Sequence, residues 1–135
     1  MAVNMLFFMR SPGGREDELL RAVAPFASEG SLEVFADIPS FAGRIRKPKA
    51  VRSIALIWNP TKEDLRAIFS LRDFLKGVRI LIALSDQGEE AIALAHRILP
   101  AYVTDVEGGI SEIVSVLKKL AHTGNYGKAR GAYQE

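Results

Sequence analysis

The chain has 135 residues, a formal net charge of +2 and 48% hydrophobic residues. These values predict one globular domain, long enough to bury roughly 70% of the surface that its unfolded chain would expose. The absence of cysteine excludes disulfides, thiolate nucleophiles and cysteine-ligated metal sites. No apolar run approaches the roughly 20 residues that a membrane span needs, so we expect a soluble, cytoplasmic protein with no membrane partner.

Five short apolar runs recur along the chain, and each is long enough for one strand. Several of them, such as residues 80–84, are apolar at every position rather than at alternate positions. This pattern is typical of parallel strands that helices cover on both faces. The five predicted strands are residues 5–9, 32–36, 54–58, 80–84 and 102–106.

The stretches between these runs have helical spacing. Apolar stripes at i, i+3, i+4 and i+7 predict helices, most clearly between the third and fourth runs and after the fifth. The two stripes are Leu65, Ile68, Phe69, Arg72 and Leu75, and Ile110, Ile113, Val114, Leu117 and Leu120. Thr61, Asp86 and Asp37 are predicted helix caps, and Gly77 is predicted to close the third helix.

Alternation of strand and helix predicts an α/β fold with five βα units. Right-handed crossovers between parallel strands give a three-layer, doubly wound (βα)5 sandwich, for which strand order 2-1-3-4-5 is the expected arrangement. We expect this domain to span residues 1–122. Residues 123–135 contain Gly124, Gly127 and Gly131 without periodicity, which predicts a flexible C-terminal tail.

Ligands of open parallel sheets gather at the carboxyl ends of the strands, so the residues there indicate the chemistry. In this chain they are poor in catalytic types, and the third predicted strand ends in the only tryptophan, Trp58. The strand-end residues are Met9, Arg10, Ser11, Trp58, Asn59, Ser85, Thr104 and Asp105.

The length, the five βα units, residues 80–85 and the closing strand and helix resemble response-regulator receiver domains, over residues 5–121. The resemblance implies a flavodoxin-like fold and a role in two-component signal transduction. Receiver domains carry an acidic pair after the first strand, a phosphorylatable aspartate after the third, a hydroxyl after the fourth and a lysine after the fifth. The acids hold Mg²⁺ and the aspartate attacks a phosphoryl group.

This chain departs from that pattern at the two positions that the chemistry needs most. The acidic pair falls on Met9 and Arg10, or on Arg10 and Ser11, and the phosphoacceptor falls on Trp58 or Asn59. Arg10 would repel a divalent cation, and the third strand offers no nucleophile. The sequence therefore predicts a degenerate pseudo-receiver that is not an enzyme and takes no metal or cofactor.

The remaining receiver positions give one match and one further departure. The lysine position falls near Thr104 or Asp105, and only Ser85 matches, in the hydroxyl position. Two hypotheses follow from these replacements. Arg10 could form a permanent ion pair with Asp105 in place of the Mg²⁺ and lysine contacts, and Trp58 could plug the vacant site.

The fourth predicted helix, residues 89–99, is apolar around most of its circumference. In receiver domains the fourth helix, fifth strand and fifth helix commonly form the dimer or effector surface. The sequence thus predicts a protein partner or a homodimer at a surface comprising Ile92, Ala93, His96, Arg97 and Tyr102. The alternative is that the alanines of this helix are good helix formers, two of them solvated.

Two other features suggest different ligands. Ser11, Gly13 and Gly14 lie in a glycine-rich turn that could bind an anion, which would make the chain a flavodoxin-like domain for a nucleotide, flavin or other small phosphate ligand. The turn lacks a P-loop lysine and the three glycines of a dinucleotide motif. Residues 44–52 carry five cations and no acid, but without interleaved aromatic side chains we expect no nucleic-acid partner.

The two histidines, His96 and His122, complete the set of candidate chemical groups. Neither has a metal-ligand partner or a serine nearby in the sequence pattern. Each lies toward the end of a predicted helix, where a cation suits the helix dipole. We therefore expect neither histidine to be catalytic.

Overall fold

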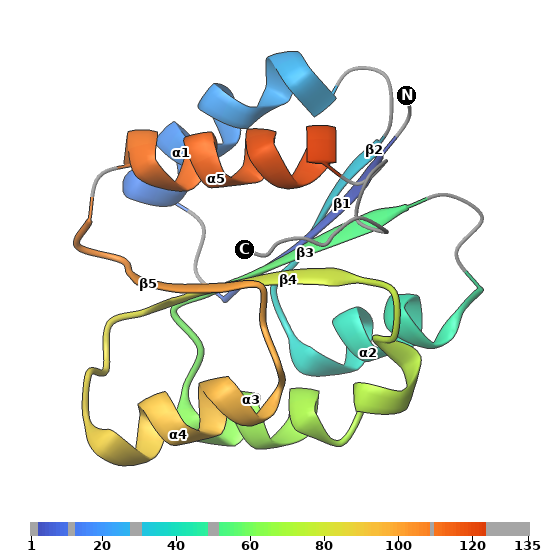
Figure 1. The fold of residues 1–135 in the computed structure, drawn as a ribbon, viewed down its shortest axis with the longest axis vertical. Coiled ribbons are helices and arrows are strands. Elements are labelled where there is room, and N and C mark those ends of the chain that lie inside the picture. Colours follow the sequence, from blue (N-terminus) through green and yellow to red (C-terminus); the bar gives the residue numbers. More distant parts are fainter. Residues whose placement is uncertain (1–2, 11–12, 28–30, 49–51, 109, 124–135) are drawn as a thin grey trace.

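The structure is a computed structural model, and it describes residues 3–10, 13–27, 31–48, 52–108 and 110–123. Five parallel strands form one sheet in the order β2-β1-β3-β4-β5 (Figure 1). The predicted fold class and strand order are confirmed. The strands are β1 (Asn4–Met9), β2 (Ser31–Phe35), β3 (Ser53–Trp58), β4 (Arg79–Leu84) and β5 (Tyr102–Asp105).

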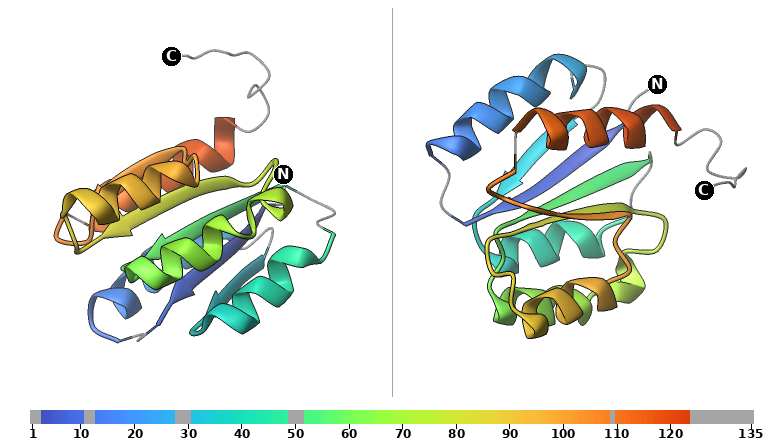
Figure 2. Two further views of the ribbon diagram at one scale, coloured as in Figure 1. Left: turned by 90° about the horizontal axis from the view of Figure 1, so that it is seen from below. Right: turned by 60° about the vertical axis from the view of Figure 1, so that its left-hand side comes forward.

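Helices cover both faces of the sheet, as Figures 1 and 2 show: α1 and α5 lie on one face, and α2, α3 and α4 lie on the other. The helices are α1 (Arg15–Val23), α2 (Ile38–Arg46), α3 (Lys62–Phe69), α4 (Glu89–Arg97) and α5 (Ile110–Thr123), with short 3-10 helices η1 (Ala24–Ala27) and η2 (Arg72–Phe74). Helix α5 includes the first residue of the predicted tail, whose other residues lie outside the described ranges.

Among the described residues, no helix combines the length and the apolar character that crossing a bilayer would require.

The two layers of helices enclose two apolar cores. On β1 the side chains alternate, so that Phe8 packs with Phe41 and Ile57 in the core beneath α2, α3 and α4. Phe7 packs with Leu117 and the other residues of the core beneath α1 and α5. Because both faces of each central strand are buried, every position is apolar, which explains the continuous hydrophobic runs in the sequence.

Two of the three predicted caps are confirmed. The Thr61 hydroxyl accepts a hydrogen bond from the Asp64 amide, and the Asp64 carboxylate accepts one from the Thr61 amide, which is a reciprocal capping box. The Asp37 carboxylate accepts from the Ser40 amide at the start of α2. The third prediction is wrong: Gly88 is the N-cap of α4, and Asp86 instead accepts from the Gly88 amide within the preceding turn.

The third helix is shorter than its apolar stripe predicts. α3 ends at Phe69, and the chain continues through η2 before β4 begins. Leu75 of the stripe is still buried in the core, but Arg72 of the stripe is exposed, and Leu71, outside the stripe, is buried instead. Gly77 does not close α3 but takes φ 82° in the turn before β4, a conformation that suits glycine.

Candidate functional site at the strand ends

A cavity of about 660 Å³ opens at the carboxyl ends of β1, β3 and β4. This is the carboxyl edge of the sheet, where the sequence predicts the degenerate receiver site. Four of the predicted strand-end residues line the cavity. The lining comprises Arg10, Glu16, Trp58, Asn59, Pro60, Thr61, Lys62, Glu63, Arg66, Ser85 and Asp86. The structure thus brings the ends of β1, β3 and β4 together, as expected.

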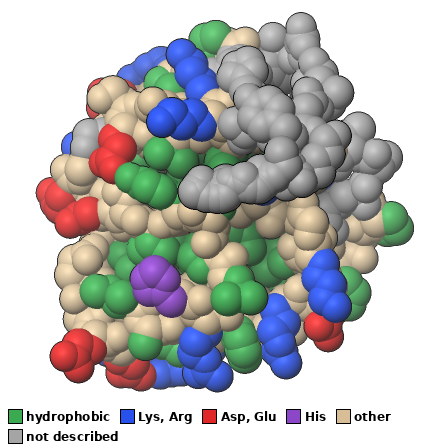
Figure 3. All heavy atoms as spheres, viewed as in Figure 1, with side chains coloured by type: hydrophobic (Ala, Val, Ile, Leu, Met, Phe, Trp, Pro, Cys, Tyr) green, Lys and Arg blue, Asp and Glu red, His purple; other side chains and the backbone are tan. Residues whose placement is uncertain are grey.

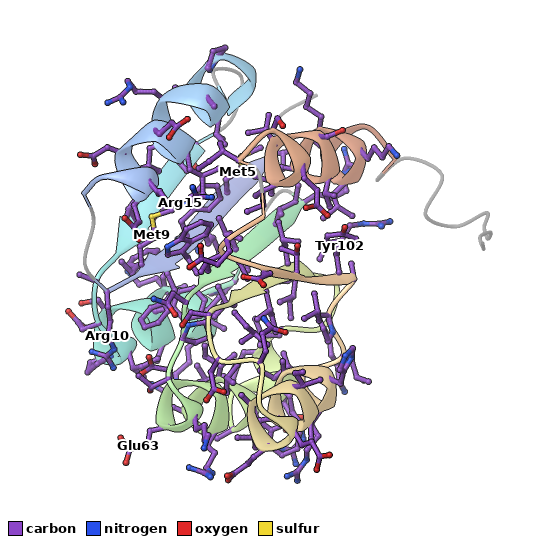
Figure 4. All side chains as sticks on the ribbon, turned by 90° about the vertical axis from the view of Figure 1, so that its left-hand side faces the viewer. Met5, Met9, Arg10, Arg15, Glu63 and Tyr102 are labelled. Carbon is purple, nitrogen blue, oxygen red and sulfur yellow. The ribbon has the colours of Figure 1, made fainter. Side chains whose placement is uncertain are left out.

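An ion pair between Arg10 and Asp64 lies at the centre of this edge. Arg10 Nε donates to Asp64 Oδ2 at 3.0 Å, and its Nη2 donates to Oδ1 of the same carboxylate. The Asp64 side chain is 2% exposed and the Arg10 side chain 48% exposed. A bidentate guanidinium contact of this kind fixes both groups in one geometry. In Figure 4, which looks onto the carboxyl edge, Arg10 lies on the side of α2 and α3.

The hypothesis that Arg10 pairs with Asp105 is therefore wrong. In the strand order β2-β1-β3-β4-β5, two strands separate β1 from β5. At a strand spacing of roughly 4.8 Å, their ends lie on the order of 14 Å apart. Helix α3 follows β3, the direct neighbour of β1, so its first turn brings Asp64 within reach of Arg10. The Asp105 carboxylate instead accepts from the Glu107 amide.

Asp64 is held ionised despite its burial. Desolvation raises its pKa, but the hydrogen bonds from Arg10 and from the Thr61 amide outweigh that effect, so the pKa lies below its usual value. The same pair raises the pKa of Arg10. Each group therefore stabilises the charged form of the other.

Trp58 fills the space beneath the cavity. Its side chain is buried in the core under α1 and α5. Its Nε1 donates a hydrogen bond to Glu16 Oε2 at 2.6 Å, which ties the end of β3 to the first turn of α1. A cavity remains beside Trp58, so the plugging of the site by this side chain stays a prediction. The hydrogen bond also gives Glu16, which the sequence analysis did not single out, a partner within the fold.

Asn59 and Ser85 form a second polar contact at this edge. Ser85 Oγ donates to the side-chain oxygen Oδ1 of Asn59 at 2.5 Å. The backbone amide of Asn59 donates to the Ala83 carbonyl at 2.7 Å. Asn59 has φ 52°, in the left-handed region that asparagine tolerates better than most residues. The predicted hydroxyl position and phosphoacceptor position are thus bonded to each other, and both carry neutral side chains.

Arg15 is a positioning residue that sequence reasoning missed. Its Nη2 donates to the Val106 carbonyl at 2.9 Å and to the Gly108 carbonyl at 2.7 Å. These bonds attach α1 to the connection between β5 and α5, just after Thr104 and Asp105, where the lysine position was predicted. Figure 4 shows Arg15 on the side of α1 and α5, opposite Arg10. Thr104 and Asp105, at the end of β5, are not among the residues lining the cavity.

The glycine-rich turn is only partly described, because Ser11 lies outside the described residues. Gly13 and Gly14 take φ 142° and 57°, and Gly14 is the N-cap of α1. The first turn of α1 carries three acids, Glu16, Asp17 and Glu18. Their charge opposes a phosphate at this helix terminus, so an anion ligand there stays a prediction without support from the geometry.

The residues of the predicted partner surface differ in exposure. Ala93, His96 and Arg97 on α4 are exposed, whereas Ile92 is half-buried against the core. Tyr102 on β5 is half-buried, and its hydroxyl donates to Glu112 on α5, which raises the pKa of Tyr102. Helix α4 buries Ala91, Leu94 and Ala95, so it has one inward face rather than an apolar circumference.

No group of three or more histidine or acidic side chains is placed to hold a metal ion within the described part of the chain. Among the acids that line the cavity, Glu16 is bonded to an indole and Asp86 to an amide, while Glu63 is exposed. Receiver-type phosphoryl transfer uses carboxylates after the first and third strands, and Arg10 and Asn59 follow those strands here.

Two solved structures share this fold. One is a candidate pilus assembly-related protein from Burkholderia pseudomallei K96243, with a TM-score of 0.67 and 20% sequence identity, over 89% of this chain and 90% of the other. The second is a candidate pilus assembly protein, CpaE, from Burkholderia thailandensis E264, with a TM-score of 0.67 and 19% identity, over 89% of this chain and 98% of the other.

No protein-family model matches the sequence. A search of curated proteins also produced no match. At 19 to 20% identity, the likeness to the two Burkholderia structures shows a shared fold and leaves the function to be argued from the residues. The chain has the five-stranded parallel α/β fold of these proteins, which is flavodoxin-like and receiver-like.

Proposed function

We propose that this chain is a non-enzymatic, receiver-like domain that acts through contact with a protein partner and does not depend on aspartyl phosphorylation. The observation that carries this proposal is the Arg10–Asp64 pair at the carboxyl edge. A cation stands where a receiver domain holds Mg²⁺, and the nearest buried carboxylate is engaged with it. Both requirements of phosphoryl transfer to aspartate are therefore missing together.

The contacts around this pair support a fixed arrangement rather than a switch. Trp58 is bonded to α1, Asn59 is bonded to Ser85, and Arg15 is bonded to the connection before α5. Each of these bonds joins two elements that surround the cavity. A receiver domain of this type would present one conformation of its helices to a partner.

The partner class is suggested by the structural neighbours, both of which carry pilus assembly in their names. We infer a role in assembly or signalling for this chain, with α4, β5 and α5 as the contact surface. β5 lies at the edge of the sheet and pairs only with β4, and Ala93 and His96 are exposed beside it on α4. A second copy of the chain is one candidate for the partner.

Phosphorylation is tested by incubating the protein with acetyl phosphate and Mg²⁺ and measuring its intact mass. We expect no added phosphoryl group, while an active receiver domain treated in the same way gains one. The Arg10→Asp/Asn59→Asp double variant places a carboxylate at the acidic-pair position and another at the phosphoacceptor position, and it is measured beside the wild type for comparison. A stable phosphoryl adduct on the wild-type chain would contradict the proposal.

The contact surface is tested by light scattering after size exclusion, with Ala93→Arg compared with Ala22→Arg. Both alanines are exposed, one on α4 and the other on α1, so the two variants add the same charge to different faces. We expect Ala93→Arg to weaken self-association and Ala22→Arg to leave it unchanged. Equal self-association of the two variants would show that α4 is not part of the contact surface.

A further inference from the structure

The amino edge of the sheet, opposite the candidate site, carries a patch with a different character. Helices α2 and α4 and the 3-10 helix η2 after α3 all end there, because the strands of a parallel sheet start at one edge and the covering helices run back toward it. We call this the amino-edge patch. It comprises Arg46, Lys47, Arg72, Phe74, Lys76, Arg97 and Leu99.

The charge of the patch is strongly one-sided. In the described residues of these helix ends, 44–48, 70–78 and 96–101, the only acid is Asp73. Five of the patch residues are cations, and all five are exposed. In Figure 3, most of the acidic side chains in view lie at the left, toward the carboxyl edge, and several Lys and Arg side chains lie along the lower right beside one acid, with others at the top. Cations suit the C-terminal ends of helices, which explains part of this distribution.

Helix dipoles do not explain the apolar residues of the patch. Phe74 is 45% exposed and Leu99 is 85% exposed. Among the described residues only one other large hydrophobic side chain, Val34, is comparably exposed. Two of the three therefore lie at one edge, beside the five cations.

Leu99 is also held in an unfavourable backbone conformation. It follows the end of α4 with φ 62°, and its amide donates to the His96 carbonyl at 3.0 Å. Glycine is the usual residue at this position, because the left-handed region is strained for a side chain with a Cβ. At 85% exposure the leucine side chain gains little burial from its own fold, so it contributes little hydrophobic stabilisation to the isolated domain.

Two of the cations are held in place by an aromatic ring. The guanidinium carbon of Arg72 lies 4.4 Å from the centroid of Phe69, and that of Arg97 lies 4.7 Å from the same centroid. Arg72 also donates to the Phe69 carbonyl at 3.2 Å. The two guanidinium groups thus share one aromatic ring at the junction of α3 and α4.

We propose that the amino-edge patch docks the domain on the surface of an anionic lipid bilayer. Several exposed cations on separate helix ends match the diffuse negative charge of lipid headgroups, and exposed leucine and phenylalanine side chains can insert below them. Nucleic acid would use the cations but would leave Leu99 in water, because leucine neither stacks on bases nor contacts phosphates. This inference does not rest on the proposed partner surface of α4, β5 and α5.

The test is co-sedimentation with vesicles of phosphatidylcholine, with and without phosphatidylglycerol, at low and high salt. We expect wild-type protein to bind only the anionic vesicles and to dissociate at high salt. Arg46→Gln/Lys76→Gln should bind about 25-fold more weakly, at about fivefold for each cation near the surface. Lys62→Gln/Arg66→Gln, which removes two cations from the carboxyl edge, should bind as wild type.

Leu99→Gly separates docking from folding. Glycine suits φ 62°, so this variant should unfold at the same temperature as wild type or higher, yet bind anionic vesicles several-fold more weakly. No binding of wild type to anionic vesicles would overturn the proposal, as would equal losses for the two charge variants. Binding of a single-stranded RNA in place of vesicles would assign the patch to nucleic acid and would also overturn it.

Discussion

The two edges of the sheet differ in how their charged residues are placed. At the carboxyl edge, Arg10 and Asp64 form a pair whose acid is almost fully buried, and Trp58 is bonded to Glu16. At the amino edge, the cations are exposed, and Leu99 extends into solvent from a strained backbone. At the carboxyl edge the ion pair and the tryptophan are held by contacts within the fold, whereas the amino edge exposes several cations together with two large apolar side chains.

The bonded groups of the carboxyl edge and the exposed groups of the amino edge should respond differently to substitution. Substitutions of the bonded residues Asp64 and Trp58 should act mainly on unfolding. On the proposal that the amino-edge patch docks on a bilayer, substitutions there should weaken binding and leave stability unchanged or improve it. Residue exposure therefore separates the two roles better than residue type does.

The largest effect on stability is expected from Asp64→Asn. The substitution removes the charge that pairs with Arg10 and weakens the capping box of α3, so we expect a loss of about 2–3 kcal/mol in the free energy of unfolding. Urea denaturation measures it. Glu63→Gln, at the exposed neighbouring position in the same helical turn, is the control and should change the free energy by less than about 0.5 kcal/mol. Equal losses for both would show that the ion pair is unimportant.

The cost of Asp64→Asn should depend on pH. The pKa of Asp64 is lower in the folded protein than its usual value, so the carboxylate stabilises the fold above the unfolded pKa of about 3.9. That contribution is lost as the pH falls through the folded pKa. The difference between wild type and Asp64→Asn should therefore be constant near neutral pH and shrink below about pH 4. A difference that is independent of pH would assign the effect to packing.

The sequence was sufficient for the fold because its signals are local and repeated. The five apolar runs correspond to the five strands, and the alternation with helices implies the strand order. The end of α3 was not predictable from the stripe, since Leu75 stays buried after the 3-10 turn at Arg72–Phe74 even though Arg72 itself is exposed. Apolar periodicity records which side chains face the core and does not distinguish an α-helix from a tighter turn.

The site was only partly predictable, because its central contact joins residues 54 positions apart. The departure of Arg10 and Trp58 from the receiver pattern was visible in the sequence. The partner of Arg10 was not, since Asp64 has the sequence pattern of a helix cap and does cap α3. Placing β1 beside β3 brings the start of α3 close to Arg10, so the strand order contained a signal that excluded Asp105 and favoured Asp64.

A smaller loss of stability is expected from Trp58→Phe. Phenylalanine fills much of the same space but cannot donate to Glu16, and a lost hydrogen bond to a charged group costs about 1–2 kcal/mol. The double-mutant cycle with Glu16→Gln measures the coupling between the two side chains. Because Trp58 is the single tryptophan, its fluorescence in the wild-type chain follows the same contact directly. Additive losses in the cycle would show that the bond contributes nothing.

The smallest effects are expected at Asn59 and Leu99. Within the described residues these are the two residues other than glycine with positive φ, and one lies at each edge of the sheet. Asn59→Gly removes the acceptor of the Ser85 hydroxyl and should cost about 0.5 kcal/mol. Leu99→Gly relieves strain without losing burial and should gain about 0.5 kcal/mol. Thermal denaturation of both variants gives the sign of each change. A loss of stability on Leu99→Gly would mean that this leucine packs within the fold, and the amino edge would then resemble the carboxyl edge.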